Sequence, residues 1–71
     1  MRNEWVAKLE AALDELEPLD REILALRHFE ELSNADAAAV LGIQPAAASK
    51  RYVRALGRLR HLLEELGGLA G

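Results

Sequence analysis

Apolar residues recur at intervals of three and four along most of this chain, which is the spacing that one face of an α-helix presents. The first segment with this pattern follows Asn3, a residue that favours helix N-caps, and ends near Leu16. Glu17-Pro18 then interrupts it, because a residue before proline avoids the helical region whereas proline suits a first helical turn. We therefore predict one helix before this dipeptide and a second over residues 18 to about 31.

A short third helix is predicted from the residues at its two ends. Ser33 stands three residues before Asp36, which is the spacing of a capping box at a helix start. Gly42 follows after about two turns, and glycine tolerates the left-handed conformation that commonly closes a helix. The third helix is therefore expected over residues 33–41.

A long fourth helix is predicted to begin at Pro45, which suits a first helical turn. The segment then continues to about residue 66 with Gly57 as its one weak point. The glycine-rich end of the chain, residues 67–71, is expected to be a flexible tail.

The third and fourth helices are joined by a three-residue turn that contains glycine, as in a helix-turn-helix. Ala37 and Ala38 permit close approach of these two helices, and Ala48 is expected to face the same contact from the fourth helix. The predicted fold is all-α. It is one four-helix domain over residues 1–66 with a C-terminal helix-turn-helix, similar to winged-helix DNA-binding domains but without a wing.

Composition excludes several classes of protein. A chain of 71 residues has room for one small core, in which we expect the three aromatic residues, Trp5, Phe29 and Tyr52. The chain has no cysteine and only two histidines, so a disulfide framework or a zinc site is not expected. No apolar run is long enough to cross a membrane, and no serine has a neighbouring base and acid. We expect a soluble intracellular protein without metal or cofactor, and not an enzyme.

The net charge of −3 conceals a division along the chain. Residues 1–43 carry four basic and ten acidic side chains, whereas residues 44–71 carry five basic and two acidic ones. All five of those basic residues fall between Lys50 and Arg60, a stretch without an acid. A positive surface can therefore coexist with an acidic body, as in proteins that bind nucleic acid.

A helical projection of the fourth helix separates an apolar stripe from a basic face. Lys50, Arg54, Arg58 and His61 cluster opposite the stripe, and Arg51 flanks them. We predict that Lys50 donates to guanine in the major groove of DNA. Arg54 and Arg58, one and two turns further on, are better placed for phosphates, which fix register more than sequence.

Five short segments carry a resemblance to a known family. They are Glu17-Pro18-Leu19-Asp20-Arg21-Glu22-Ile23, Leu26-Arg27-His28-Phe29-Glu30, Leu32-Ser33, Ala38-x-x-Leu41-Gly42-Ile43 and Arg51-Tyr52-x-Arg54-Ala55. With these segments, residues 15–60 resemble the C-terminal domain (region 4) of bacterial sigma factors of the sigma-70 family. The resemblance is greatest to the extracytoplasmic-function (ECF) group.

The resemblance implies a function in transcription initiation in the bacterial cytoplasm. Domains of this family read the −35 element of double-stranded promoter DNA, bind the β-flap of the RNA polymerase core and can be masked by anti-sigma factors. The family's base- and backbone-contacting positions fall here on Ser49, Lys50, Val53 and Arg54, with Arg51 beside them. The domain that melts DNA and binds the −10 element is missing from this sequence. We therefore expect either part of a longer sigma factor or a stand-alone protein.

Two alternatives remain open. The chain is also compatible with a stand-alone helix-turn-helix regulator that dimerises on a palindrome, although no extra dimerisation helix is evident. It is compatible, too, with a protein-interaction module whose acidic first two helices carry the function. A sigma-type domain predicts an asymmetric DNA site, a dimeric regulator predicts a two-fold site, and an interaction module predicts no dependence of DNA binding on Lys50 or Arg54.

Overall fold

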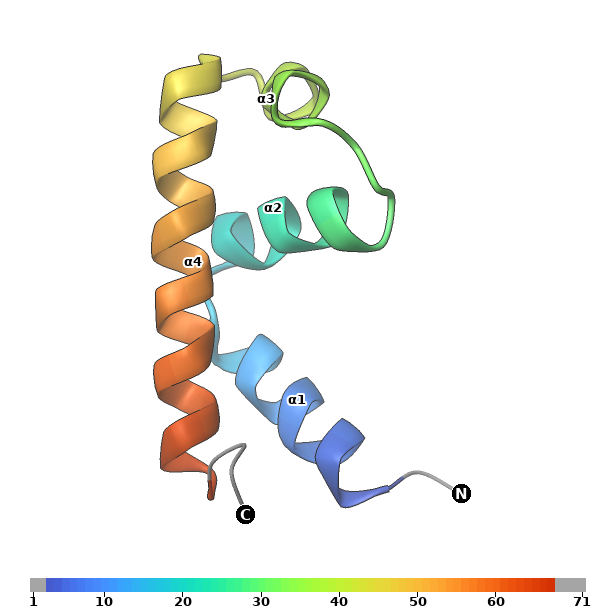
Figure 1. The fold of residues 1–71 in the computed structure, drawn as a ribbon, viewed down its shortest axis with the longest axis vertical. Coiled ribbons are helices and arrows are strands. Elements are labelled where there is room, and N and C mark those ends of the chain that lie inside the picture. The colour runs from blue at the N-terminus through green and yellow to red at the C-terminus, as the bar shows by residue number, and fades with distance from the viewer. Residues whose placement is uncertain (1–2, 68–71) are drawn as a thin grey trace.

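The computed structural model describes residues 3–67, which form four helices and no strand (Figure 1). The helices are α1 (Glu4–Glu15), α2 (Pro18–His28), α3 (Asn34–Leu41) and α4 (Pro45–Glu65). The predicted all-α fold with a C-terminal helix-turn-helix is confirmed. Of the tail that we expected to be flexible, only Gly67 is described, in a turn after α4, and residues 68–71 lie outside the described residues.

The starts of the helices follow the predicted local signals. The Oδ1 atom of Asn3 accepts a hydrogen bond of 2.8 Å from the amide of Val6 and so caps α1. Pro18 occupies the first turn of α2 after an extended residue. The hydroxyl of Ser33 accepts a 3.1 Å hydrogen bond from the amide of Asp36 at the start of α3.

The end of α2 differs from the prediction, because this helix stops at His28 rather than near residue 31. The backbone closes it without a glycine. The carbonyls of Ala25 and Leu26 accept hydrogen bonds from the amides of Glu30 and Leu32, two and four residues beyond the helix, at 3.0 and 2.9 Å. Glu31 takes the left-handed conformation with φ 57°, which turns the chain toward α3. No breaker residue marks this point in the sequence.

The turn between α3 and α4 is built as expected. Gly42 is left-handed, with φ 70°, and the amide of Ile43 donates to the carbonyl of Ala38 at 3.0 Å. The side-chain amide of Asn34, at the start of α3, donates to the carbonyl of Pro45 at 2.9 Å. A hydrogen bond therefore links the first residue of α3 to the first residue of α4.

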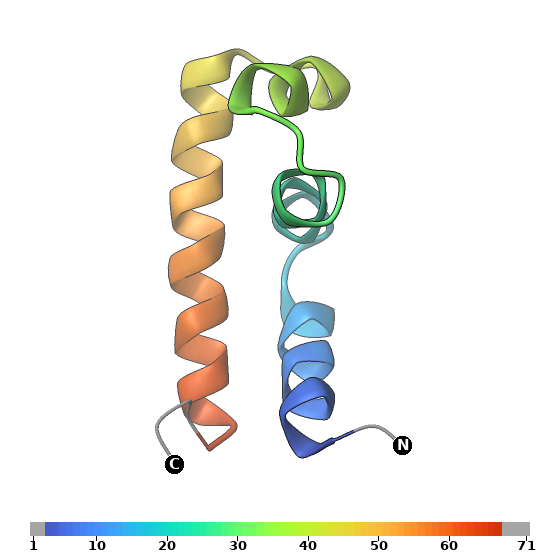
Figure 2. The same cartoon turned by 45° about the vertical axis from the view of Figure 1, so that its right-hand side comes forward.

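α4 forms the spine of the molecule, and the other three helices pack along it (Figures 1 and 2). α1 lies beside the C-terminal half of α4, α2 beside its middle, and α3 across its N-terminal end. Ile23 of α2 is the largest side chain that is fully buried. The core joins all four helices through Ala12, Leu16, Ile23, Leu24, Ala38, Ala48, Ala55, Leu62 and Leu63.

The prediction that all three aromatic side chains lie in the core is wrong for two of them. Trp5 is 44% exposed and Phe29 is 76% exposed, whereas Tyr52 packs at the edge of the core. The one buried residue of α1, Ala12, lies in its C-terminal half, and the first turn, with Trp5, does not reach the core. Phe29 follows the last residue of α2, and a helical projection therefore no longer applies to it. The hydroxyl of Tyr52 lies 2.7 Å from Nε2 of His28.

Candidate nucleic-acid interface

Four side chains gather on the outer face of α4, directly after the turn from α3. Ser49, Lys50, Val53 and Arg54 are all exposed, and together they line a shallow hollow. All four stand at positions that the family resemblance assigns to contacts with DNA. The hollow combines two positive charges, one hydroxyl and one aliphatic side chain.

The buried side of α4 holds this face outward. Ala48 and Ala55 are fully buried, and they lie on the opposite side of the helix from the hollow. Leu62 and Leu63 continue the buried side for two more turns. Rotation of α4 would expose these residues to water, so packing fixes which side chains point away from the body.

The two cations of the hollow are available to an external anion. Within residues 3–67, neither Lys50 nor Arg54 forms an ion pair. Both side chains are exposed, and α4 carries no acidic residue in its first turn. An approaching phosphate would therefore meet positive charge without displacing an internal partner.

Arg51 is placed differently from these two residues. Its Nη1 atom lies 3.2 Å from Oδ1 of Asp20 in α2, and the two side chains are 35% and 20% exposed. A bond to one nitrogen leaves other donors of the guanidinium unused. Arg51 therefore joins α4 to α2, and it is not the free flanking cation that the helical projection indicated.

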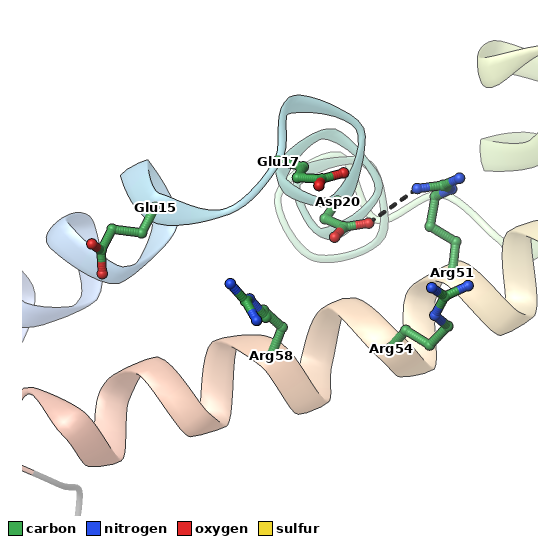
Figure 3. Close-up of a pocket in the computed structure, with 6 residues that line it drawn as sticks. All are labelled: Glu15, Glu17, Asp20, Arg51, Arg54 and Arg58. Atoms are coloured by element: carbon green, nitrogen blue, oxygen red, sulfur yellow. Dashed lines mark hydrogen bonds and ion pairs between the residues drawn. The ribbon is translucent and has the colours of Figure 1, made fainter.

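A second hollow lies between α4 and the junction of α1 and α2 (Figure 3). Three carboxylates and three guanidinium groups line it: those of Glu15, Glu17, Asp20, Arg51, Arg54 and Arg58. Figure 3 shows Arg58 extending from α4 toward this junction. Arg58 thus lies beside acids, at the edge of the basic face rather than at its centre.

The basic face is shorter than the sequence indicated. Arg60 and His61 each lie near a glutamate one helical turn further along α4. Nε of Arg60 is 3.8 Å from a carboxylate oxygen of Glu64, and Nε2 of His61 is 3.4 Å from one of Glu65. Within the described part of the chain, the basic residues of α4 without an ion pair are therefore Lys50, Arg54 and Arg58.

The sequence did not identify the acids that face the arginines. In the sequence, Asp20 is distinguished only as a member of a segment that resembles the family, and its partner Arg51 is 31 positions away. Glu15 and Glu17 flank the α1–α2 junction and carry no motif. Because three helices bring these groups together, no local spacing could have predicted the cluster.

An apolar groove lies on another side of the molecule, between α1, α2 and α4. Its lining consists of Leu9, Leu13, Leu24, His28, Phe29, Leu56 and Leu59. Phe29 and Leu56 are 76% and 37% exposed, so apolar surface is open to solvent here. Exposed apolar grooves of this kind commonly mark contacts with other proteins.

Residues 3–67 contain neither a cluster of metal ligands nor a membrane-spanning helix. No group of three or more histidine or acidic side chains is arranged to hold a metal ion. None of the helices has the length and apolar character needed to cross a membrane.

Comparisons with known proteins agree with this architecture. Residues 7–59 match the protein family described as "Sigma-70, region 4". An RNA polymerase sigma-E factor of Streptomyces antibioticus is 40% identical over 58 residues, which cover 82% of this chain and 32% of that protein. An RNA polymerase sigma-E factor of Streptomyces avermitilis is 41% identical over 49 residues, covering 69% of this chain and 27% of that protein. The chain thus spans about a third or less of the length of these relatives.

Proposed function

This chain belongs to the sigma-70 region 4 family, and from that premise we propose that it recognises the −35 element of promoter DNA as part of a sigma factor that directs RNA polymerase. The observation that carries the proposal is the grouping of Ser49, Lys50, Val53 and Arg54 on one exposed face of α4. This face follows a helix-turn-helix turn, which is the position of the residues that read DNA in such folds.

In the proposed complex, the start of α4 enters the major groove. Ser49 and Lys50 hydrogen-bond to base edges, with Lys50 donating to guanine O6 or N7. Arg54 and Arg58 bind phosphates, and Arg51 uses the donors that Asp20 leaves free for the same purpose. The amide groups at the start of α3 donate further hydrogen bonds to the phosphate backbone of the DNA. The assignment thus separates base readers from phosphate anchors.

The proposed partners are double-stranded promoter DNA and the core of RNA polymerase through its β-flap, in the bacterial cytoplasm. The apolar groove between α1, α2 and α4 supports a protein partner, because it lies apart from the DNA-reading hollow. An anti-sigma factor would mask the domain by covering either surface. The isolated chain should bind DNA weakly, because it makes few phosphate contacts and its body is acidic. Tethering to polymerase would raise the effective concentration of the domain at the promoter.

The experiment that tests the DNA assignment is selection from random duplex DNA at low salt, with Lys50→Ala in parallel. We expect a short asymmetric motif, and Lys50→Ala should weaken the preference at one base pair by about 1–3 kcal/mol. Arg58→Ala is the matched control, because loss of a phosphate contact should weaken all sequences alike and reduce the salt slope by about one unit.

Three other results of the selection would contradict this expectation in different ways. A palindromic motif would favour a dimeric regulator. Absence of a motif both from the chain alone and from its mixture with core polymerase would favour an interaction module. An asymmetric motif that Lys50→Ala leaves unchanged would refute the role assigned to Lys50.

The polymerase contact is tested at Phe29, the most exposed large apolar side chain of the described residues. Phe29→Ala should weaken binding to core polymerase at least about fivefold, because truncation of a side chain that anchors an interface costs more than about 1 kcal/mol. Binding would be measured by titration of labelled chain with core enzyme. The variant should keep the wild-type DNA motif, and equal affinities of variant and wild type would argue against this groove as the docking site.

A further inference from the structure

Asn34 is the first residue of α3, and its side chain reaches across to the first residue of α4. Its Nδ2 atom donates a hydrogen bond of 2.9 Å to the carbonyl of Pro45, a residue 11 positions away. Within residues 3–67, no other side-chain hydrogen bond joins α3 to α4. Gln44, at the N-cap of α4, makes no side-chain hydrogen bond to that helix. Among the described residues, the side chain of Asn34 is therefore the one that holds the start of α4 by a hydrogen bond.

The remaining contact between α3 and the start of α4 is built on small side chains. Ala37 and Ala38 of α3 are buried, as is Ala48 of α4. Interlocking of larger side chains is what specifies one packing arrangement, and a methyl group provides little of it. The turn through Gly42 joins the C-terminal end of α3 to α4, whereas Asn34 joins its N-terminal end, about 10 Å away along the axis. The hydrogen bond thus opposes a change in the angle between the two helices.

The environment of this amide suits a role in orientation rather than in stability. Oδ1 of Asn34 is buried and has no hydrogen-bond partner among the described residues. Relative to the unfolded chain, that unpaired acceptor offsets what the bond from Nδ2 contributes. A small change of helix angle, in contrast, breaks the 2.9 Å bond while Oδ1 stays buried. The side chain therefore adds little to the free energy of unfolding but favours one angle over its neighbours.

We infer that Asn34 is a positioning residue for DNA recognition, which acts by fixing the angle of α3 relative to α4. This inference rests on the proposed function, in which the first amides of α3 bind phosphate while Lys50 reads a base. Both contacts form together only at one relative orientation of the two helices. Without the bond, a smaller fraction of molecules has that orientation, and the affinity for the motif falls in proportion. Binding to an arbitrary sequence relies on phosphates alone and depends less on the angle.

Gln44 provides a matched control for Asn34. Its side chain ends in the same carboxamide group and is exposed, in the turn between the same two helices. Gln44→Ala removes this amide without removing a hydrogen bond between helices, whereas Asn34→Ala removes the bond. Thermal unfolding shows whether the fold is kept. The midpoint of Asn34→Ala should lie within about 4 °C of the wild-type value.

The first test compares two affinities of the same protein. Dissociation constants for the selected motif and for a scrambled duplex are measured by fluorescence anisotropy at one low salt concentration. Asn34→Ala should lower the preference for the motif over the scrambled duplex about fivefold, which corresponds to about 1 kcal/mol, the net contribution of one hydrogen bond. Gln44→Ala should leave this preference unchanged.

The second test needs no DNA. Because the chain has no cysteine, Val40→Cys in α3 and Arg60→Cys in α4 create two unique sites for spin labels. Both positions are exposed. The distribution of distances between the labels is measured by double electron–electron resonance. It should broaden when Asn34→Ala is added and stay as narrow as before when Gln44→Ala is added.

Several results would overturn the inference and leave the proposed function intact. An equal loss of affinity for motif and scrambled duplex would make Asn34 a direct phosphate contact. A lower unfolding midpoint with an unchanged preference would make its role purely structural. An unchanged distance distribution would show that other contacts fix α3. Failure to select any motif, with or without core polymerase, overturns the proposed function and the inference together.

Discussion

Asp20 and Arg51 show how a single residue changes its role between sequence and structure. In the sequence, Arg51 flanks the basic face of a helix, and Asp20 belongs to the first turn of another. In the fold, their 3.2 Å ion pair links α2 to α4 in the middle of the molecule, where the two helices cross. The pair is partly shielded from water, so it is worth more than a fully exposed pair on one helix.

Asp20→Asn is expected to reduce the free energy of unfolding by about 0.5–1 kcal/mol, because the amide carries no charge to hold the guanidinium. The measurement is urea unfolding followed by circular dichroism. Glu22→Gln is the control, since it removes the same charge from α2 at an exposed position. The cost of Arg51→Ala should also be smaller in the Asp20→Asn background than in wild type. If the two costs simply add, the ion pair contributes nothing to stability.

At the scale of the element, two glycines have different conformational roles, one at the end of a helix and one inside a helix. Gly42 ends α3 in the left-handed conformation, with φ 70°. Gly57 lies within the regular helix α4. A Cβ atom added at either position would meet no other atom within 4 Å. Conformation alone therefore distinguishes the two sites.

Substitution of each glycine by alanine should change stability with opposite signs. Gly57→Ala should stabilise the protein by about 0.5–1 kcal/mol, because glycine is the poorer helix former. Gly42→Ala should destabilise it by about 1–2 kcal/mol, because a Cβ atom is strained in the left-handed region. Thermal unfolding of the two variants provides the comparison. Shifts of the same sign would contradict the helix end that the structure assigns to Gly42.

At the scale of the whole molecule, the acidic body lies close enough to the basic helix to influence its binding of phosphate. Glu15 and Glu17 share a hollow with Arg54 and Arg58 at the α1–α2 junction (Figure 3). An anion that approaches those arginines also approaches the carboxylates. The arrangement of charge in three dimensions thus limits the positive surface more than the sequence indicated.

Glu17→Gln is expected to increase the affinity for DNA of any sequence by less than about fivefold, because a single exposed charge interacts weakly through water. The comparison is with Glu22→Gln, which changes the net charge equally but does not line the hollow. Affinities would be measured by fluorescence anisotropy over a range of salt concentrations. The difference should shrink as salt is added, because ions screen exposed charges. Equal effects of the two variants would show that net charge alone, and not the hollow, governs affinity.

The sequence alone determined where the helices begin and which residues face outward at the start of α4. Asn3, Pro18, Ser33 and Pro45 act within one turn of the backbone, and helical periodicity separated Lys50 and Arg54 from the buried alanines. These features were predictable because each depends on residues only a few positions apart.

Only the tertiary structure decided the end of α2, the exposure of Phe29 and the ion pair between Asp20 and Arg51. Backbone hydrogen bonds end α2 at a point where the sequence has neither glycine nor proline. The side chain of Phe29, which follows the helix, consequently lies in solvent. The acids beside the basic helix come from segments about 31 or more positions away. Charges separated by that length of chain meet only when the packing of the core brings their helices together, because electrostatic interaction depends on distance in space and not on separation in sequence.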